Sequence, residues 1–391
     1  MKWIARRYDT GQLVHAHLIG DRVDRFFPSN QPDLDETIPY VAPGFVDIQV
    51  NGYGGQEFSS IALTSESVTR IVEQHFEFGV TAICPTLTTQ TWEVFHHSVK
   101  AIATACNASS TTGRAVWGIH LEGPHMSKED GPRGAHPAEH CCPPDWNQLQ
   151  RLQETAEGRI RLVTLSPEYE GSPHYIAKAT RAGIVVAIGH TSAARDQILA
   201  AVDSGARLST HLGNGAHREL KRHPNYIWDQ LGEDRLMASL ICDGHHLPPE
   251  VVRTFVRAKS LEQCILVSDV SGLAGLPPGK YGSSGCELEI LADGRLVIAG
   301  QDQLLAGASD PIGVGILNVM KFAGLSLKEG VEMASHHPAR LLGKTPGGFL
   351  PGDPADFTLF HVDRAPDGSA RNLKIAATIL AGHVVYGSIR K

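Results

Sequence analysis

Residues 64–86 read TSESVTRIVEQHFEFGVTAICPT, and they contain the helix–strand alternation that decides the fold. The first part carries one apolar stripe at helical spacing, formed by Val68, Ile71, Val72 and Phe76. Polar capping candidates precede this stripe and Gly79 follows it, so we expect a helix that ends before Gly79. The remaining residues, GVTAICPT, are a short apolar run typical of a buried strand.

The same kind of strand is predicted eight times along the chain. The runs are GFVDIQV, GVTAICPT, AVWGIHLEG, RIRLVTLSP, GIVVAIGHT, ARLSTHLGN, LMASLICDG and CILVSDVSG. Helical patterns lie between them, for example TWEVFHHSVKAIATA and DQILAAVDSG. Eight strands alternating with helices from residue 45 to about 340 predict an α/β fold, a closed parallel (β/α)8 TIM-type barrel, because an open doubly wound sheet usually has fewer strands.

The two ends of the chain are expected to form one small β domain. Residues 1–43 contain alternating pieces such as QLVHAHLI, and residues 346–391 contain ADFTLFHV, IAATIL and HVVYG. Each end is too short to fold alone. We therefore expect a small β-sandwich domain from residues 1–43 and 346–391, beside a barrel domain over residues 44–345.

A turn-rich segment near residues 271–303 follows the eighth predicted strand. Asp293 and Gly294 form a hairpin signal within it. We expect this insertion to form a flap over the mouth of the barrel.

Composition and charge favour a protein that acts on small molecules. The chain has 391 residues, a formal net charge of -7 and no basic stripe, which argues against nucleic-acid and anionic-membrane partners. The first residues, MKWIARRYDT, do not resemble a signal peptide, and no apolar run approaches the ~20 residues of a membrane span. These features predict a cytoplasmic protein.

The seven cysteines are interpreted as buried reduced thiols without a catalytic role.

Polar residues stand at the end of nearly every predicted barrel strand, where such barrels carry their catalytic groups. These residues are Gln49, Asn51, His120, Glu122, His190, His211, Asp243, His246 and Asp269. A lone strand-end histidine among 20 is more often structural, but several on consecutive strands indicate a site. Glu122, His190 and His211 offer one carboxylate and two imidazoles, which suit zinc or another divalent ion and leave a position for water. Asp269 would face that water as a base.

The motifs PGFVDIQVNGYGG, HLEGP, GAHP, GHT, THLGN, DGHH, VSDVSG and LAGAS follow one another along nearly the whole chain. In this order they resemble the N-acetylglucosamine-6-phosphate deacetylase family of the amidohydrolase superfamily. The resemblance implies metal-dependent removal of acetate from an N-acetylated amino-sugar phosphate. It also implies Glu122, His190 and His211 as metal ligands and Asp269 as the catalytic carboxylate.

The amides of the first strand bear on the number of metals. Many superfamily members carry His-x-His there and hold two ions, whereas this chain matches the branch with Gln-x-Asn and one ion per subunit. Amides bind transition metals weakly. Gln49 and Asn51, and with them His120, are therefore expected to support the site from behind the ligands. The expected ion is zinc, with Fe, Co or Mn as alternatives.

The resemblance further assigns residues to the substrate. His136 is expected to polarise the acetyl carbonyl, and His246 to contact the sugar phosphate. Asn214, Gly215 and Ala306 complete the expected substrate contacts within the subunit.

In the family, an arginine of the neighbouring subunit in a homodimer reads the phosphate. This chain departs from the family there, with GAHRELKRHPNYIWDQL in place of N-A-M followed by R-E-P-G. Arg222 keeps the spacing and the following proline, and is assigned this role, while Arg218 and Lys221 compete for it.

Three other functions stay open at this point. One is deacetylation of N-acetylgalactosamine 6-phosphate or of an unphosphorylated sugar. A second is opening of a cyclic amide, whose enzymes usually carry His-x-His and often a lysine that bridges two metals, and this chain lacks both. A third is a non-enzymatic binding protein, which would be expected to have a broken ligand set, whereas this ligand set is intact.

Overall fold

The computed structural model describes every residue except 31–36, 284–285, 367, 369 and 390–391. Eight parallel strands form a sheet in the order β14-β13-β12-β11-β10-β9-β8-β5. The last strand and the first are joined where the Asp269 N–H donates to the Gln49 carbonyl (3.1 Å) and the Asn51 N–H donates to the Val270 carbonyl (2.9 Å). These bonds close the sheet, so the predicted (β/α)8 barrel is confirmed.

Each barrel strand falls within one of the eight predicted runs or extends it by two residues. The strands are β5 (Phe45–Val50), β8 (Val80–Thr88), β9 (Ile119–Glu122), β10 (Ile160–Leu165), β11 (Val185–Ile188), β12 (Leu208–Ser209), β13 (Met237–Ile241) and β14 (Cys264–Val267).

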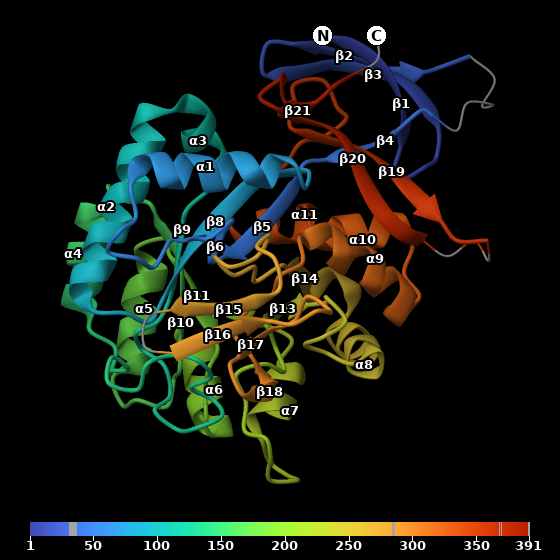
Figure 1. Cartoon of the computed structure of the whole chain (residues 1–391). Coiled ribbons are helices and arrows are strands. Elements are labelled where there is room, and N and C mark those ends of the chain that lie inside the picture. Colours follow the sequence, from blue (N-terminus) through green and yellow to red (C-terminus); the bar gives the residue numbers. More distant parts are fainter. Residues whose placement is uncertain (31–36, 284–285, 367, 369, 390–391) are drawn as a thin grey trace.

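Helices follow the strands and surround the barrel (Figure 1). They are α1 (Ser65–Phe76), α2 (Trp92–Ala108), α3 (Ser110–Ala115), α4 (Trp146–Thr155), α5 (Ser172–Arg181), α6 (Arg195–Asp203), α7 (Tyr226–Leu231), α8 (Pro249–Lys259), the 3-10 turn η1 (Leu261–Gln263), α9 (Ile312–Ala323), α10 (Leu327–Met333) and α11 (His336–Leu341).

Helix α1 shows how the sequence sets one of these elements. The Thr64 side chain accepts the Ser67 N–H at the first turn, and the helix ends before Gly79, whose φ is 77°. Its predicted apolar stripe is fully buried against the barrel. Burying each side chain of this stripe contributes about 1.5–3 kcal/mol, so packing dominates the stability of the helix.

Two apolar layers hold the barrel together. One fills the space between strands and helices, and the other fills the barrel interior. On β5, Val46 and Ile48 belong to the interior layer, whereas Val50 belongs to the outer one. The change falls at a register shift between Asp47 and Val50 in the pairing of β5 with β8. Such a bulge re-aims the side chains that follow it, and here it lies beside Gln49.

Both ends of the chain join one seven-stranded sheet in the order β21-β20-β19-β4-β1-β2-β3 (Figure 1, blue and red). The strands are β1 (Lys2–Arg7), β2 (Leu13–Ile19), β3 (Arg22–Pro28), β4 (Tyr40–Pro43), β19 (Phe357–Arg364), β20 (Ala370–Leu380) and β21 (His383–Gly387). The predicted small β domain built from both ends is therefore confirmed.

This sheet curls around its own core. Phe26 on β3 and Phe357 on β19 are four strands apart in the sheet order, which is about 19 Å in a flat sheet. Their ring centroids nevertheless lie 5.4 Å apart, and Trp3 contacts both rings. The predicted sandwich is thus one continuous sheet that folds over on itself.

A four-stranded antiparallel sheet, here called the flap sheet, follows β14 in the chain. Its strands are β15 (Gly279–Ser283), β16 (Cys286–Ile290), β17 (Leu296–Ile298) and β18 (Gln301–Leu305). The turn between β16 and β17 contains Asp293 and Gly294, and Gly294 adopts a φ of 89° that a larger residue rarely adopts. The hairpin predicted at these residues is present. A two-stranded ribbon, β6 (Gly52–Tyr53) with β7 (Gln56–Glu57), follows β5.

Among the described residues, no helix combines the length and apolar character that a membrane crossing requires. The six cysteines that the structure describes are free thiols, and all but Cys142 are buried.

Candidate active site

A cavity of about 600 Å³ opens at the carboxyl ends of the barrel strands. Its walls come from the strand ends, from the loops after β9 and β12, and from the flap sheet. This is the size and place in which a TIM-type barrel binds a small substrate. The predicted residues that line the cavity are Asn51, Glu122, His136, His190, His211, Asn214, Gly215, His246, Asp269 and Ala306.

Three of these side chains bring their donor atoms to one point at the base of the cavity. Glu122 Oε1 lies 2.9 Å from His211 Nε2 and 3.5 Å from His190 Nε2, and the two Nε2 atoms are 3.1 Å apart. Ligands held 2.0–2.1 Å from a tetrahedral ion lie about 3.3 Å from one another. Donor types and spacing therefore both fit a divalent metal ion.

The backbone that positions three side chains at the base of the cavity is unusual. His190 and His211 have φ values of 48° and 29°, and Asp269 has a φ of 54°. Positive φ costs free energy for residues other than glycine and tends to occur at functional sites. The Nδ1 of His190 lies 2.9 Å from the Pro132 carbonyl, which can only accept. A ring that donates from Nδ1 to this carbonyl would keep its Nε2, on the side of Glu122 and His211, as the ligand atom for an ion.

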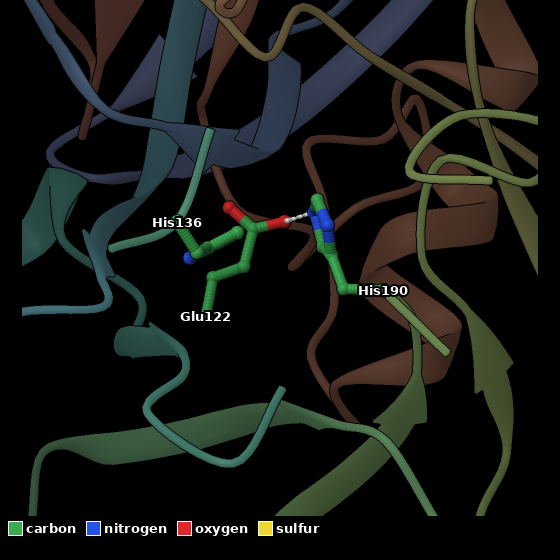
Figure 2. A group of neighbouring side chains, drawn as sticks. All are labelled: Glu122, His136 and His190. Carbon is green, nitrogen blue, oxygen red and sulfur yellow. Dashed lines mark ion pairs between the residues drawn. The ribbon is translucent and has the colours of Figure 1, made fainter. Parts of the chain in front are cut away.

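His136 stands beside the same carboxylate. Glu122, His136 and His190 have potential ligand atoms within 4.8 Å of one another, and Figure 2 shows the ion pair between Glu122 and His190 in this group. The backbone N–H of Thr89, which can only donate, lies 3.4 Å from His136 Nδ1, and the Thr89 hydroxyl is 2.8 Å from it. Nδ1 therefore accepts and Nε2 carries the proton. This favours His136 as a hydrogen-bond donor and His211 as the third ligand.

The buried charged groups at this point shift one another's pKa values. Burial raises the pKa of Glu122, but the hydrogen bonds of His190 and His211 outweigh burial and hold that pKa well below its usual value. Burial lowers the pKa of His211, but its bond to Glu122 raises it above the ordinary value. Burial lowers the pKa of His136 to about 3, so this ring is neutral. An ionised carboxylate beside the neutral His136 ring is suited to a cation, which would compete with the proton that Glu122 favours on His211.

Asp269 and the two amides of the first strand form a second group at the cavity floor. Gln49 Nε2 donates to Glu122 Oε1 (2.9 Å) and to Asp269 Oδ1 (3.1 Å), and Asn51 Nδ2 donates to the same Oδ1 (2.8 Å). The amides thus orient both carboxylates. Burial, and then the charge of Glu122, raise the pKa of Asp269, which makes it a stronger base than a solvated aspartate.

His120 and His246 differ in their relation to the cavity. His120 is buried, with Nδ1 bonded to the Ile48 carbonyl (3.1 Å) and Nε2 to the Thr164 hydroxyl (2.7 Å), so neither nitrogen is free for a ligand. His246 lines the cavity and its Nδ1 donates to Asp243 (2.6 Å). Its Nε2 is therefore left for a substrate.

The arginines of the loop after β12 lie in different places. Arg218 lines the cavity. Arg222 is exposed and is not among the residues that line the cavity of this chain. A role for Arg222 would need a second subunit and stays a prediction.

Sequence reasoning missed several residues of the cavity wall, among them Glu57, Thr89 and Arg295. Arg295 follows the predicted turn at Asp293 and Gly294 directly, so the turn itself was the available signal. Thr89 follows the second barrel strand as the other site residues follow theirs, and the same rule would have found it.

Comparison with known proteins gives a consistent result. Residues 40–385 match the model of the amidohydrolase family. The chain is 34% identical over 357 residues to N-acetylglucosamine-6-phosphate deacetylase of Homo sapiens, covering 88% of this chain and 83% of the human protein. It is 29% identical over 367 residues to N-acetylgalactosamine-6-phosphate deacetylase of Shewanella sp. (strain ANA-3), covering 92% of this chain and 86% of that protein.

Among solved structures, a mutant N-acetyl-D-glucosamine-6-phosphate deacetylase from Mycobacterium smegmatis in complex with N-acetyl-D-glucosamine-6-phosphate is similar over the whole chain. The TM-score is 0.85 at 28% identity, with 98% of this chain and 99% of that chain covered.

Proposed function

This chain belongs to the amidohydrolase family, and we propose that it hydrolyses the acetamide of N-acetyl-D-glucosamine 6-phosphate to glucosamine 6-phosphate and acetate. The observation that carries this proposal is the convergence of Glu122, His190 and His211 at 2.9–3.5 Å beside the buried carboxylate of Asp269. The substrate is suggested by the human and mycobacterial proteins to which the chain is similar.

Glu122, His190 and His211 would hold one divalent ion per subunit. When bound, the ion supplies Lewis acidity toward the acetyl carbonyl and toward water. One carboxylate and two imidazoles favour zinc, although Fe, Co and Mn accept similar donors. A second tightly held ion lacks ligands because amides occupy positions 49 and 51. Elemental analysis of the purified protein should give close to one ion per chain, and two tightly held ions would contradict this assignment.

The chain's own residues carry the proton transfers. Asp269 takes a proton from the attacking water as its oxygen adds to the acetyl carbon. The Nε2–H of His136 donates to the carbonyl oxygen, which gains negative charge at this stage. Asp269 then gives its proton to the sugar nitrogen as the C–N bond breaks. Acetate and the free amine leave, and no other reactant is consumed.

The phosphate would lie at the rim of the cavity, near Asn214, Gly215 and His246. We propose a homodimer in which Arg222 reaches the phosphate bound by the partner subunit. Two large apolar side chains near Arg222 are exposed, Leu220 at 38% and Trp228 at 50%. Exposed apolar groups beside a protruding loop favour a protein contact there. The dimer can be tested by measuring the mass of the native protein in solution.

An acetate-release assay tests the reaction itself. N-acetylglucosamine 6-phosphate, N-acetylgalactosamine 6-phosphate and N-acetylglucosamine should be compared at equal concentration. We expect the first to give the highest kcat/KM. A preference for the galactosamine compound would move the assignment toward the activity named for the Shewanella relative. No acetate from any of them would contradict the proposed function.

A further inference from the structure

The flap sheet places one guanidinium group at the mouth of the cavity, on the turn between β16 and β17. Arg295 lines the cavity together with His245, His246 and Arg218. These side chains come from three separate segments, which are the flap sheet and the loops after β13 and β12. The mouth of the cavity therefore gathers cationic and imidazole groups that belong to a single subunit.

The turn that carries Arg295 is held in place from both sides. Asp293 accepts the Arg295 backbone N–H (3.2 Å) and its Nε–H (2.8 Å). The Arg295 carbonyl accepts the Leu291 N–H (2.8 Å), which closes the hairpin. The Ser309 hydroxyl donates to the Gly294 carbonyl, so the turn is fastened to the loop that precedes α9. The backbone of the turn is thus held in place, and the bond to Asp293 orients the guanidinium.

The guanidinium of Arg295 still has hydrogen-bonding capacity. Asp293 engages only Nε, and within the part of the chain that the structure describes the two terminal nitrogens of Arg295 have no hydrogen-bond partner. Two terminal N–H groups in one plane match two oxygens of a phosphate. The side chain is 35% exposed, so a ligand in the cavity can reach it.

We propose that Arg295 is a specificity-determining residue that binds the phosphate of the substrate from within the same subunit. This inference rests on the proposed deacetylation of an amino-sugar phosphate and adds a contact that the sequence motifs do not indicate. Through Arg295 the flap sheet contacts the phosphate directly, because the turn that forms part of the cavity wall also carries the guanidinium. Arg222 of a partner would then be an addition to a phosphate site that one chain already provides.

The test compares Arg295→Ala, Arg295→Lys and wild type on phosphorylated and plain sugars. Arg295→Ala should raise KM for N-acetylglucosamine 6-phosphate between about tenfold and a hundredfold, the usual effect of losing charge-assisted hydrogen bonds, while kcat stays within about twofold. The kcat/KM for N-acetylglucosamine should not change. Arg295→Lys should recover part of the loss, because it restores the charge without the paired donors.

Lys280→Ala is the matched control. Lys280 is a cation on β15 of the same sheet, pairs with Glu287 at 3.5 Å and does not line the cavity. Lys280→Ala should leave KM and kcat unchanged for both the phosphorylated and the plain sugar. The inhibition constant of inorganic phosphate and the dissociation constant of glucosamine 6-phosphate give readouts that need no turnover of a chosen substrate, and both should rise in Arg295→Ala.

Two results would overturn the inference. An equal loss on phosphorylated and plain sugars would mean that Arg295 only shapes the flap sheet, and an unchanged preference would mean that it does not contact the phosphate. Failure of the proposed function would look different. Wild type would then release no acetate from N-acetylglucosamine 6-phosphate, while binding of inorganic phosphate and glucosamine 6-phosphate would still report on Arg295.

Discussion

The floor of the cavity consists of buried side chains at strand ends, whereas its rim consists of exposed side chains on turns and loops. On the floor, Glu122, His211 and Asp269 are at most 8% exposed, and each is bonded to at least two other site residues. On the rim, Arg218 is exposed on the loop after β12, and the same loop carries the exposed Arg222 beyond the cavity lining. The floor is fixed by strands that cannot move without opening the barrel, whereas the rim depends on turns and loops.

This difference separates chemistry from selectivity. A reaction that needs donor atoms within a few tenths of an ångström of one position belongs on strand ends, where packing fixes side chains. Recognition of a phosphate tolerates larger differences in the position of the binding side chains, and it can change with the sequence of a loop. Changes on the floor should therefore lower kcat or metal content, and changes on the rim should alter KM for phosphorylated substrates. Substitutions on the floor and on the rim test this separation.

The largest effect is expected for Asp269→Asn. The amide cannot take or return the proton, so kcat should fall by roughly 10²-fold or more, the usual scale for general acid–base catalysis. Asp269 is not one of the three proposed ligands, so the metal content should stay near that of wild type. Acetate release and elemental analysis on the same preparation check both statements. Near-normal turnover would remove Asp269 from the mechanism.

A smaller loss of activity is expected for Gln49→Met. Methionine has a similar volume but no hydrogen-bond donor. The change removes the hydrogen bonds to Glu122 and Asp269 (2.9 and 3.1 Å). Groups that orient metal ligands typically contribute 10–100-fold to metal affinity or activity, so a loss of about tenfold or more is expected in both. Metal affinity is measured by dialysis against a graded series of chelator concentrations, followed by elemental analysis.

Gln230→Met is the matched control for this change. Gln230 is also buried, at 4% exposure, and donates to the Tyr226 carbonyl (3.0 Å) away from the ligands. It should lower the thermal stability without changing metal affinity. If both variants lose metal equally, the effect of Gln49 is a general loss of stability and the floor has no special dependence on its amides.

Much of the floor could be predicted from the sequence because each apolar run ends at a polar residue. Glu122, His190, His211 and Asp269 each stand toward the polar end of such a run, and a closed parallel barrel brings these ends together. The helix before Gly79 was predicted equally well, since its apolar stripe has no competing pattern. Local periodicity was enough in both cases.

The remaining features depend on contacts between distant segments. The bulge beside Gln49 arises from the pairing of β5 with β8, and the tautomer of His136 depends on Thr89, 47 residues away. The approach of Arg295 to the cavity depends on how the flap sheet docks. Neither hydrophobic period nor a motif encodes such docking, so the rim was predicted less completely than the floor.

Arg222→Ala tests the rim across two subunits. The phosphate is bound in both the ground state and the transition state. Loss of the Arg222 guanidinium should therefore raise KM more than it lowers kcat. We expect an increase in KM of about tenfold for N-acetylglucosamine 6-phosphate and none for N-acetylglucosamine. The same kinetics on Arg218→Ala and Lys221→Ala identify which cation of this loop is used. An unchanged preference in all three would show that the loop does not read phosphate.

The smallest effect is expected where rim and floor are joined. Glu129 Oε2 lies 3.0 Å from His217 Nε2, and this pair connects the loop that carries His136 to the loop after β12. The Tyr226 hydroxyl accepts the His217 backbone N–H (2.8 Å) and therefore donates to Nδ1 (3.0 Å), which leaves the Nε2–H for Glu129.

Through Pro132 the same loop fixes the ring of His190, so the pair could influence the metal site from a distance. Glu129 is 62% exposed, however, and exposed pairs contribute about 0.2–1 kcal/mol, which corresponds to less than about a fivefold change. Glu129→Gln should therefore lower kcat by less than about fivefold and leave metal retention against a chelator nearly unchanged. Glu139→Gln, which removes the same charge from an exposed position on this loop, should have no effect. A loss of metal or of more than tenfold in kcat in Glu129→Gln alone would show that the rim sets the geometry of the floor, and the separation between the two regions would have to be abandoned.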